Sequence, residues 1–193
     1  MRLGILDNGH SLPMKGLFAV MRGISRLPVP DAVKVNRYRP DFYGTPMRVL
    51  TQEAMRGPSA WSVGDRELMG ASVSKMNECE VCTKTHAGVA ALAYQDEAKV
   101  SAALVDLETA VIDEPVRATL RMLRKLTRDH TVNADDMRAV LAAGVSREQI
   151  EDALAVCFTF NTVDRLSRTF GWVVSSPKAF EAGAKFLLAR GYR

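Results

Sequence analysis

The chain has 193 residues and a mass of 21.2 kDa, which lies at the upper end of the size range of a single compact domain. Hydrophobic residues make up 47% and charged residues 25% of the sequence, a balance that excludes collagen-like, disordered and membrane-embedded proteins. The formal net charge of +4, with a pI near 9.1, is too small to indicate a nucleic-acid or a membrane partner. We therefore expect one domain spanning residues 1–193, with no nucleic acid and no membrane among its partners.

The cysteine content and the apolar runs indicate the compartment. Three cysteines are too few for the disulfide scaffold of a secreted protein of this length. Charged and polar residues interrupt positions 1–16, where an export signal needs an apolar run, and no apolar stretch approaches the ~18 residues that cross a bilayer. We expect the protein in a reducing cytoplasm.

The first part of the chain is expected to form an N-terminal arm. Prolines stand at positions 13, 28, 30 and 40 and leave room for one helix at residues 15–25. We interpret residues 1–38 as an extended arm that wraps on a helical body of residues 39–193. An arm of this kind is suited to packing against a second subunit.

The body of the chain reads as helical throughout. Helix-forming residues recur at three- and four-residue spacing, and alternating apolar and polar runs are nearly absent. This pattern predicts an all-α fold. The first helix of the body is expected at residues 41–55, interrupted near residues 44–46 and ended by the pair Gly57-Pro58.

Two capping boxes are predicted next along the chain. Ser62 followed by Asp65 opens a helix that runs to about residue 76. Asn77 followed by Glu80 opens another that runs to about residue 94. The two cysteines of a CxxC motif would therefore lie in the first turns of this second helix.

The remaining helices follow from similar signals. Pro115 opens an amphipathic helix whose outer side we interpret as a solvated basic face. That face carries Arg117, Arg121, Arg124 and Arg128. Further helices are expected at residues 133–143, from Ser146 towards residue 160, and at residues 177–189.

The CxxC motif is the strongest chemical signal. Cys79 and Cys82, three residues apart on a helix, have Cα atoms about 5 Å apart, inside the range that a disulfide spans. His86 follows Cys82 by four residues and so lies on the same face, within reach of its sulfur directly or through a water. A helix N-terminus that lowers a thiol pKa from about 8.5 to about 6.5 raises the thiolate fraction at neutral pH from roughly 3% to 75%. These residues indicate a redox-active pair with an adjacent base.

Other readings of the cysteines are weaker. A zinc site would need four tetrahedral ligands, and three ligands on one helix (Cys79, Cys82 and His86) fit that geometry poorly. No second CxxC or HxxxH motif supplies the missing ligand. Covalent haem needs a histidine directly after the second cysteine, where Thr83 stands. An inert packing role stays open for the pair and is the favoured reading of Cys157, which sits in an apolar helical run. We therefore expect no metal and no cofactor.

Several segments together carry a family resemblance. The pattern is a glutamate, then Cys-x-x-Cys, then x-x-x-His, and it is surrounded by further matching stretches. The matching stretches are residues 39–40, 55–59, 61–68, 74–86 and 160–166. This pattern resembles the peroxidase-related branch of the AhpD/carboxymuconolactone decarboxylase family. The resemblance implies an AhpD-like, all-helical homo-oligomer (a dimer, trimer or hexamer) that reduces organic hydroperoxides with electrons from an external dithiol, such as a lipoyl- or thioredoxin-type protein.

The resemblance also assigns roles to individual residues. It implies that Glu67, on the preceding helix, orients His86 as a proton relay for the cysteine pair. We expect Cys82 to attack the hydroperoxide, because it has the adjacent base, and Cys79 to condense with the resulting sulfenic acid. The inverted order stays open, because in thioredoxin-like motifs the N-terminal cysteine has the lower pKa.

Two departures from the family pattern leave questions open. Val81 stands where the best-known family member has a histidine between its cysteines, which puts proton delivery to Cys79 in doubt. Asp164 stands before Arg165 where relatives often have asparagine, and the sequence assigns neither residue a chemical task. Three other functions remain open: a dithiol-disulfide oxidoreductase without peroxidase activity, a decarboxylase-like enzyme that shares only the fold, and a redox-regulated binding protein.

Overall fold

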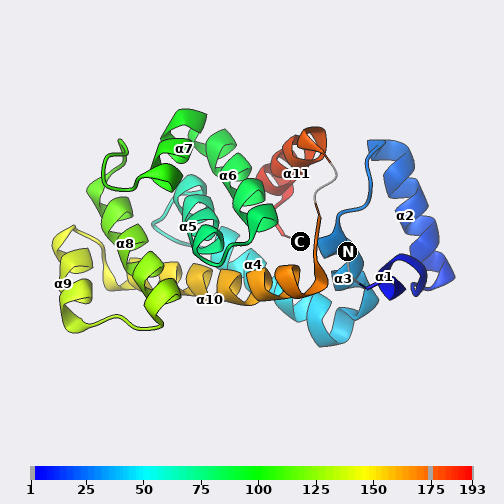
Figure 1. The fold of residues 1–193 in the computed structure, drawn as a ribbon, viewed down its shortest axis with the longest axis horizontal. Coiled ribbons are helices and arrows are strands. Elements are labelled where there is room, and N and C mark those ends of the chain that lie inside the picture. The colour runs from blue at the N-terminus through cyan, green and yellow to red at the C-terminus, as the bar shows by residue number, and fades with distance from the viewer. Residues whose placement is uncertain (1–2, 174–175, 193) are drawn as a thin grey trace.

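The computed structural model describes residues 3–173 and 176–192. Within these ranges the regular structure is entirely helical, with eleven α-helices, one π-helical turn and no β-strand, and this confirms the all-α prediction (Figure 1). The elements in chain order are α1 (Ile5–Asn8), α2 (Leu12–Ser25), α3 (Asp31–Tyr38), η1 (Pro40–Gly44), α4 (Thr45–Arg56), α5 (Val63–Met76), α6 (Glu80–Tyr94), α7 (Glu97–Val105), α8 (Glu114–Asp129), α9 (Ala134–Ala142), α10 (Arg147–Phe170) and α11 (Pro177–Arg190).

Helix α5 is the centre of the molecule. Nearly all of its residues from 64 to 74 are buried, so it shows no apolar stripe and needs small side chains where neighbours approach. Gly64 and Gly70 provide this room, since a Cβ atom there would meet the rings of Tyr94 and Phe160 at 2.8 Å and 2.6 Å. Helices α6, α8 and α10 pack around α5 and close the core.

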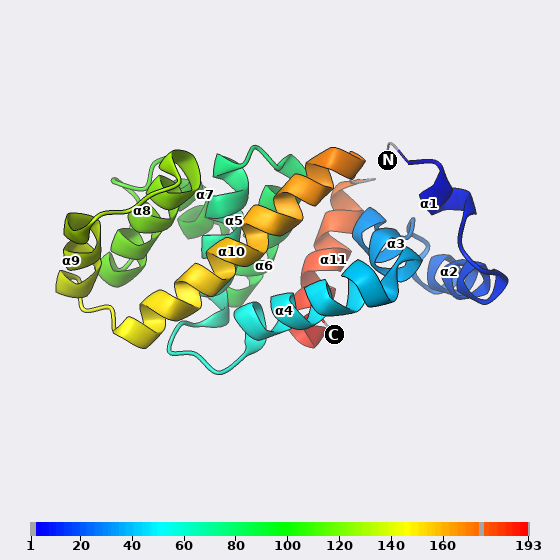
Figure 2. The ribbon, with the colours of Figure 1, turned by 90° about the horizontal axis from the view of Figure 1, so that it is seen from below.

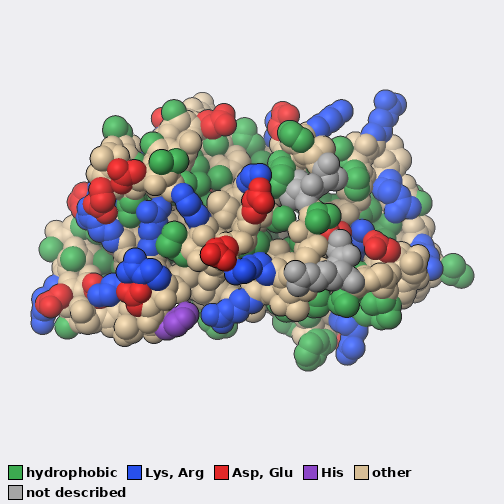
Figure 3. Space-filling view, in the orientation of Figure 1, with side chains coloured by type: hydrophobic (Ala, Val, Ile, Leu, Met, Phe, Trp, Pro, Cys, Tyr) green, Lys and Arg blue, Asp and Glu red, His purple; other side chains and the backbone are tan. Residues whose placement is uncertain are grey.

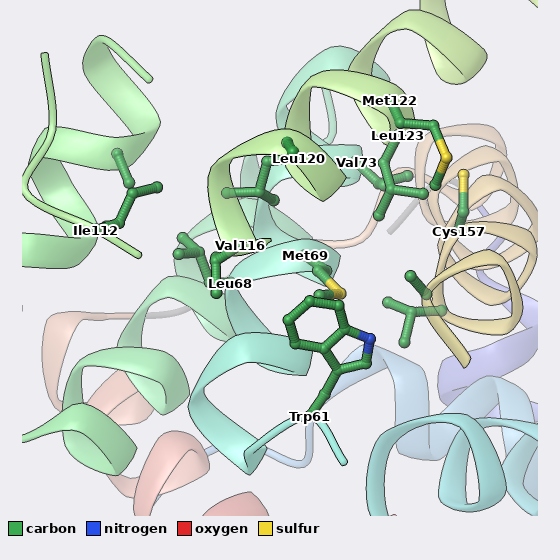
Figure 4. Close-up of a cluster of buried hydrophobic side chains, with 14 of the residues drawn as sticks. Trp61, Leu68, Met69, Val73, Ile112, Val116, Leu120, Met122, Leu123 and Cys157 are labelled. Atoms are coloured by element: carbon green, nitrogen blue, oxygen red, sulfur yellow. The ribbon is translucent and has the colours of Figure 1, made fainter. Parts of the chain in front are cut away.

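The core joins side chains from helices that are far apart in sequence. Figure 4 shows Leu68, Met69 and Val73 of α5 in one cluster with residues of α8. Cys157 of α10 belongs to the same cluster and is 2% exposed, which confirms its predicted burial. Helix α10 crosses this core diagonally in Figure 2, packed on α4, α5 and α8, while α11 packs on α6.

The N-terminal arm is more helical than the sequence suggested. The prediction of a single helix was incomplete, because α1 and α3 flank α2. Pro30 directly precedes α3, and its fixed φ of −58° is compatible with the start of a helix. The sequence predicted a helix breaker at this proline, but in the structure it stands where a helix begins. Helices α1 and α2 lie at the end of the molecule opposite α8 and α9 (Figures 1 and 2). The division into a residue 1–38 arm and a residue 39–193 body stays a prediction.

The basic side of α8 is partly structural, which corrects its interpretation as a solvated face. Arg117 donates to the carbonyls of Leu107 and Ala110, and Arg124 donates to Ser72 Oγ and to the Ala103 carbonyl, both at 2.8 Å. These arginines fasten α7 and the following loop to the core. Positive and negative side chains are interspersed on the face in Figure 3.

No helix among the described residues has the length and apolarity that crossing a membrane requires.

Candidate active site

The two cysteines lie at the start of α6, in a tight corner after α5. The predicted capping box of Asn77 and Glu80 is wrong: α5 ends at Met76, Glu78 adopts a left-handed φ of 55°, and Cys79 is the residue that precedes α6. The Cys79 and Cys82 sulfurs are 2.7 Å apart, and both thiols are free and buried. The corner therefore holds two sulfurs within bonding reach of each other.

The surroundings of the two thiols differ, and so do their pKa values. The hydrogen bond between the two sulfurs lowers the pKa of Cys79, burial opposes this, and the hydrogen bond between Cys79 and the Ser167 hydroxyl at 3.4 Å lowers it further. The same hydrogen bond raises the pKa of Cys82, as do its burial and the negative charge of Asp164. Of the two thiols, Cys79 therefore loses its proton more readily than Cys82.

Glu67 and His86 form the second part of the site. Glu67 is fully buried in α5, and its Oε2 lies 2.7 Å from Nδ1 of His86 in α6. Its Oε1 lies 2.7 Å from the Arg56 guanidinium and accepts a hydrogen bond from the Tyr192 hydroxyl at 2.8 Å. The Tyr192 hydroxyl is also 3.1 Å from His86 Nδ1. Three elements besides α5 thus converge on one carboxylate.

The charge of Glu67 fixes the state of the histidine ring. Burial alone would raise the pKa of Glu67, but the His86 hydrogen bond and the positive charges of His86 and Arg56 outweigh it and hold that pKa below its usual range. An ionised carboxylate only accepts hydrogen bonds, so Nδ1 carries a proton and Nε2 is the nitrogen that can exchange one. The ring also packs edge-on against Phe160, with centroids 4.4 Å apart. His86 is therefore oriented from two sides.

Asp164 of α10 is a second buried carboxylate in this region. It is 0% exposed and accepts hydrogen bonds from Ser74 Oγ and Asn77 Nδ2, each at 2.9 Å. Burial raises its pKa, and the hydrogen bonds from Asn77, Cys82 and Ser74 offset this only in part. This carboxylate differs from Glu67 in having neutral hydrogen-bond partners.

A metal ion in this part of the site would draw on Cys79, Cys82 and Asp164, whose donor atoms all lie within 4.8 Å of one another. Two thiolates on one tetrahedral zinc stand roughly 3.8 Å apart, because each Zn–S bond is about 2.3 Å long. The sulfurs here are 2.7 Å apart, so their spacing suits a disulfide better than a shared metal. Within the described ranges no fourth cysteine, histidine or carboxylate joins this group.

A surface hollow of about 250 Å³ borders one of the two cysteines. Cys79 and Ser167 line it together with Arg168 and Trp172 from the end of α10 and the segment after it. Of the two cysteines only Cys79 is among the lining residues, and both are buried, with Cys79 2% and Cys82 4% exposed.

The structure brings the predicted residues together in two contacts, Cys79 with Cys82 and Glu67 with His86. Sequence reasoning gave no role to Arg56 or Tyr192, both of which bind Glu67 directly. Arg56 lies in a stretch that carries the family resemblance, but the resemblance assigned this residue no chemical role. Tyr192 gives no signal in the sequence, since it is 125 residues from its partner.

The order and packing of these helices define the class of fold, and the comparison with solved structures identifies it as AhpD-like. This chain superposes with a TM-score of 0.77 on an uncharacterized peroxidase-related protein from Silicibacter sp. TM1040, at 18% identity over 92% of this chain and 93% of that one. The TM-score is 0.76 with the alkylhydroperoxidase AhpD core of an uncharacterized peroxidase-related protein from Ralstonia eutropha JMP134, at 20% identity over 95% and 96%. No family model and no curated protein matches the sequence. The protein thus combines an AhpD-like fold with a CxxC pair, as the resemblance implied.

Proposed function

We propose that this protein is a thiol peroxidase that reduces organic hydroperoxides through a Cys79–Cys82 dithiol/disulfide cycle. One observation carries the proposal: the free, buried sulfurs of Cys79 and Cys82 lie 2.7 Å apart at the start of α6. The same helix holds His86, which is hydrogen-bonded to the buried Glu67. A sulfur pair this close closes a disulfide without large movement. The histidine and glutamate supply the oriented proton donor that cleavage of a peroxide bond requires.

The first step takes place at Cys79. Its thiolate attacks the terminal oxygen of the hydroperoxide, the O–O bond breaks, and the leaving alkoxide takes a proton to become the alcohol. The sulfur gains the hydroxyl group and becomes a sulfenic acid, so it is oxidised by two electrons while the peroxide is reduced by two. Two features support this choice: the lowered pKa of Cys79 and its place in the surface hollow. The proposal reverses the order that the position of His86 favoured in the sequence.

His86 and Glu67 act as the proton relay of this step. In its protonated form the imidazole gives a proton from Nε2 to the leaving alkoxide and regains one from solvent. Glu67, which receives Nδ1–H at 2.7 Å, holds the ring in place and stabilises its positive charge. Arg56 and Tyr192 keep the carboxylate charged and fixed.

The second half of the cycle regenerates the dithiol. Cys82 attacks the Cys79 sulfenic acid, a disulfide forms, and the hydroxyl group leaves as water. An external dithiol, of the lipoyl or thioredoxin type, then reopens the disulfide by exchange. We place this exchange at Cys79, the cysteine that lines the hollow. We further propose that the protein works as a homo-oligomer in the cytoplasm.

The test is hydroperoxide consumption with a dithiol donor. We expect the wild type to consume cumene hydroperoxide with dihydrolipoamide, and Cys79→Ser and Cys82→Ser to lose this activity. The matched control is Cys157→Ser, since this buried thiol lies in the core and should be dispensable for turnover. A sulfenic-acid trap should label Cys79 in Cys82→Ser. Consumption that persists in both active-site variants would refute the proposal.

The same assay separates a second candidate function, a dithiol-disulfide oxidoreductase, which the position of Cys79 beside the surface hollow also supports. That enzyme would oxidise dithiols with a disulfide substrate and leave the hydroperoxide untouched. The alkoxide-protonation role of His86 gives a further distinction: His86→Gln should slow hydroperoxide consumption much more than it slows exchange with a disulfide.

A further inference from the structure

We infer that the Asp164 carboxylate is the base that takes the Cys82 proton when this thiol closes the disulfide. The inference deepens the proposed function and rests on its dithiol cycle. It assigns a chemical task to a residue for which the sequence gave none. The task is distinct from that of Glu67 and His86, which serve the peroxide-cleaving step.

The Asp164 carboxylate lies beside the sulfur pair. One Asp164 carboxylate oxygen and the sulfurs of Cys79 and Cys82 all lie within 4.8 Å of one another. Helix α10 delivers the carboxylate to the corner between α5 and α6, and Ser74 and Asn77 from that corner hold its two oxygens at 2.9 Å each. The carboxylate is therefore fixed beside the sulfur pair.

Cys82 has a proton that it must give up during disulfide closure. Cys82 is the thiol that holds its proton more firmly, because its hydrogen bond with Cys79, its burial and the negative charge of Asp164 all raise its pKa. To attack a sulfur, Cys82 first has to lose that proton, and the thiolate form is unfavourable in this buried place. A base next to the sulfur removes the proton as the S–S bond forms, so no free thiolate has to accumulate.

The surroundings of Asp164 allow it to accept a proton. It is completely buried, and no lysine or arginine within the described part of the chain forms an ion pair with it. Its uncompensated burial raises its pKa, so the neutral acid is accessible at a milder pH than for an ordinary aspartate. Glu67, held charged by Arg56, is unsuited to this task.

Among the described residues, titratable groups that interact electrostatically with Asp164 lie on α6 and α10. Cys79, Cys82 and His86 lie on α6, and Cys157 lies seven residues before Asp164 on α10. The nearest of these are the two sulfurs of the redox pair. Asp164 is therefore placed to accept the proton of the Cys82 thiol, which must lose it when the disulfide closes.

The step balances without any further reactant. With Cys79 in a mixed disulfide, the Cys82 proton moves to the Asp164 carboxylate, the Cys82 sulfur bonds to Cys79, and the other sulfur of the mixed disulfide leaves as a thiolate. With Cys79 as a sulfenic acid, the same proton passes through Asp164 to the departing hydroxide, and water leaves.

The mixed-disulfide step allows a test without peroxide. Reduced protein carrying Cys157→Ser, so that two thiols remain, is mixed with dithiodipyridine, and release of thiopyridone is followed by stopped flow. The first equivalent reports attack by Cys79, and the second reports closure by Cys82. Both phases are measured between about pH 5 and pH 9 in the parent protein and in Asp164→Asn.

The two proteins should give crossing pH profiles for the second phase. Near pH 6 the amide cannot accept a proton, and closure in Asp164→Asn should be about tenfold slower or more. Near pH 9 the variant should be equal or faster, because loss of the negative charge eases ionisation of Cys82. Lost packing would slow closure at every pH and cannot produce a crossing. Asp152→Asn, a carboxylate on the same helix that binds Ser59 at 2.6 Å, is the matched control and should leave both phases unchanged.

A second variant keeps the inference testable if Asp164→Asn does not fold. Ser74→Ala removes one donor to the carboxylate, so the acid limb of the second phase should move to higher pH in that variant. Closure that is unchanged in both variants, or faster in Asp164→Asn at every pH, would overturn the inference. Because no peroxide takes part, a crossing profile in a protein that fails to consume hydroperoxide would refute the peroxidase proposal and leave the role of Asp164 standing.

Discussion

Replacing Glu67 by glutamine tests whether the buried carboxylate is held by its charge. Its two oxygens accept from His86 at 2.7 Å and from Tyr192 at 2.8 Å, and they pair with Arg56 at 2.7 Å. Glutamine has one oxygen and one amide NH2 group in place of two accepting oxygens. Whichever way it turns, the NH2 group faces a donor, and one buried group loses its partner.

The expected cost follows from the burial of these groups. Removing one partner of a buried ion pair destabilises a protein by about 3–5 kcal/mol. Glu67 is 0% exposed, but the Arg56 side chain is 11% exposed and reaches some solvent, so we expect the lower end, about 3 kcal/mol. For a chain of this length that is a fall of about 6–12 °C in Tm.

The pH dependence gives the sign of the effect. The pKa of Glu67 is held below its ordinary value of 4.5, so its charge contributes stability that is complete above that value. This contribution is lost as the pH falls through the lower, folded-state pKa. The difference in Tm between the wild type and Glu67→Gln should therefore be full at neutral pH and shrink in acid.

The measurement is thermal unfolding followed by circular dichroism, from neutral pH down to about pH 3. Tyr192→Phe is the control, since it removes one neutral donor and should cost about 1 kcal/mol. A variant as stable as the wild type at neutral pH, or a gap in Tm that does not change with pH, would show that the charge of Glu67 is not what holds the site together.

Three further predictions concern the elements around the site. Gly70→Ala places a Cβ atom 2.6 Å from the buried Phe160 ring, so it should cost about 1–2 kcal/mol net of the gain in helix propensity. It should also slow turnover, because that ring packs against His86, the proposed proton donor. Ser146→Ala removes the capping box of α10 and should lower Tm by about 2–4 °C with thiol reactivity unchanged. Ser167→Ala removes a hydrogen bond to Cys79, so the pKa of Cys79 should rise and its alkylation by iodoacetamide should shift to higher pH.

Each of these has its own control. Gly183→Ala makes the same change in a helix with no atom within 4 Å and should be neutral or stabilising by up to about 1 kcal/mol. Ser146→Asp keeps a capping oxygen and should behave as the wild type does. A stabilised Gly70→Ala variant would refute the steric conflict with the Phe160 ring. An unchanged Tm in Ser146→Ala would refute the contribution of the capping box, and an unchanged alkylation profile in Ser167→Ala would refute the effect of Ser167 on the pKa of Cys79.

Local signals explain what the sequence could predict. The capping box of Ser62 is present, and so is that of Ser146, because a side chain and the backbone three residues later need no other part of the chain. Asn133 begins α9 with a further capping box at the position where a helix was expected. The spacing of the two cysteines and of His86 is equally local, and it was enough to indicate a redox pair.

Tertiary contacts explain what the sequence could not predict. Asn77 carried the signal of a helix cap, but its amide donates to Asp164 at 2.9 Å and to Asn161 at 3.2 Å instead. Two hydrogen bonds to α10 replace one local cap, and α6 begins at Glu80 as a result. The same limit applies to Tyr192, whose contact with Glu67 depends on how α11 returns to the core.

The two buried carboxylates of the site differ in the charge of the groups that surround them. Glu67 has a guanidinium and an imidazole beside it, so its pKa is low, whereas Asp164 has neutral partners and a raised pKa. Two acids in like surroundings would titrate together, and neither could orient a charged ring while the other exchanged protons. Environments that push the two pKa values apart separate these tasks. The orienting acid keeps its charge beside His86, and the exchanging acid stands beside the thiol that has a proton to lose.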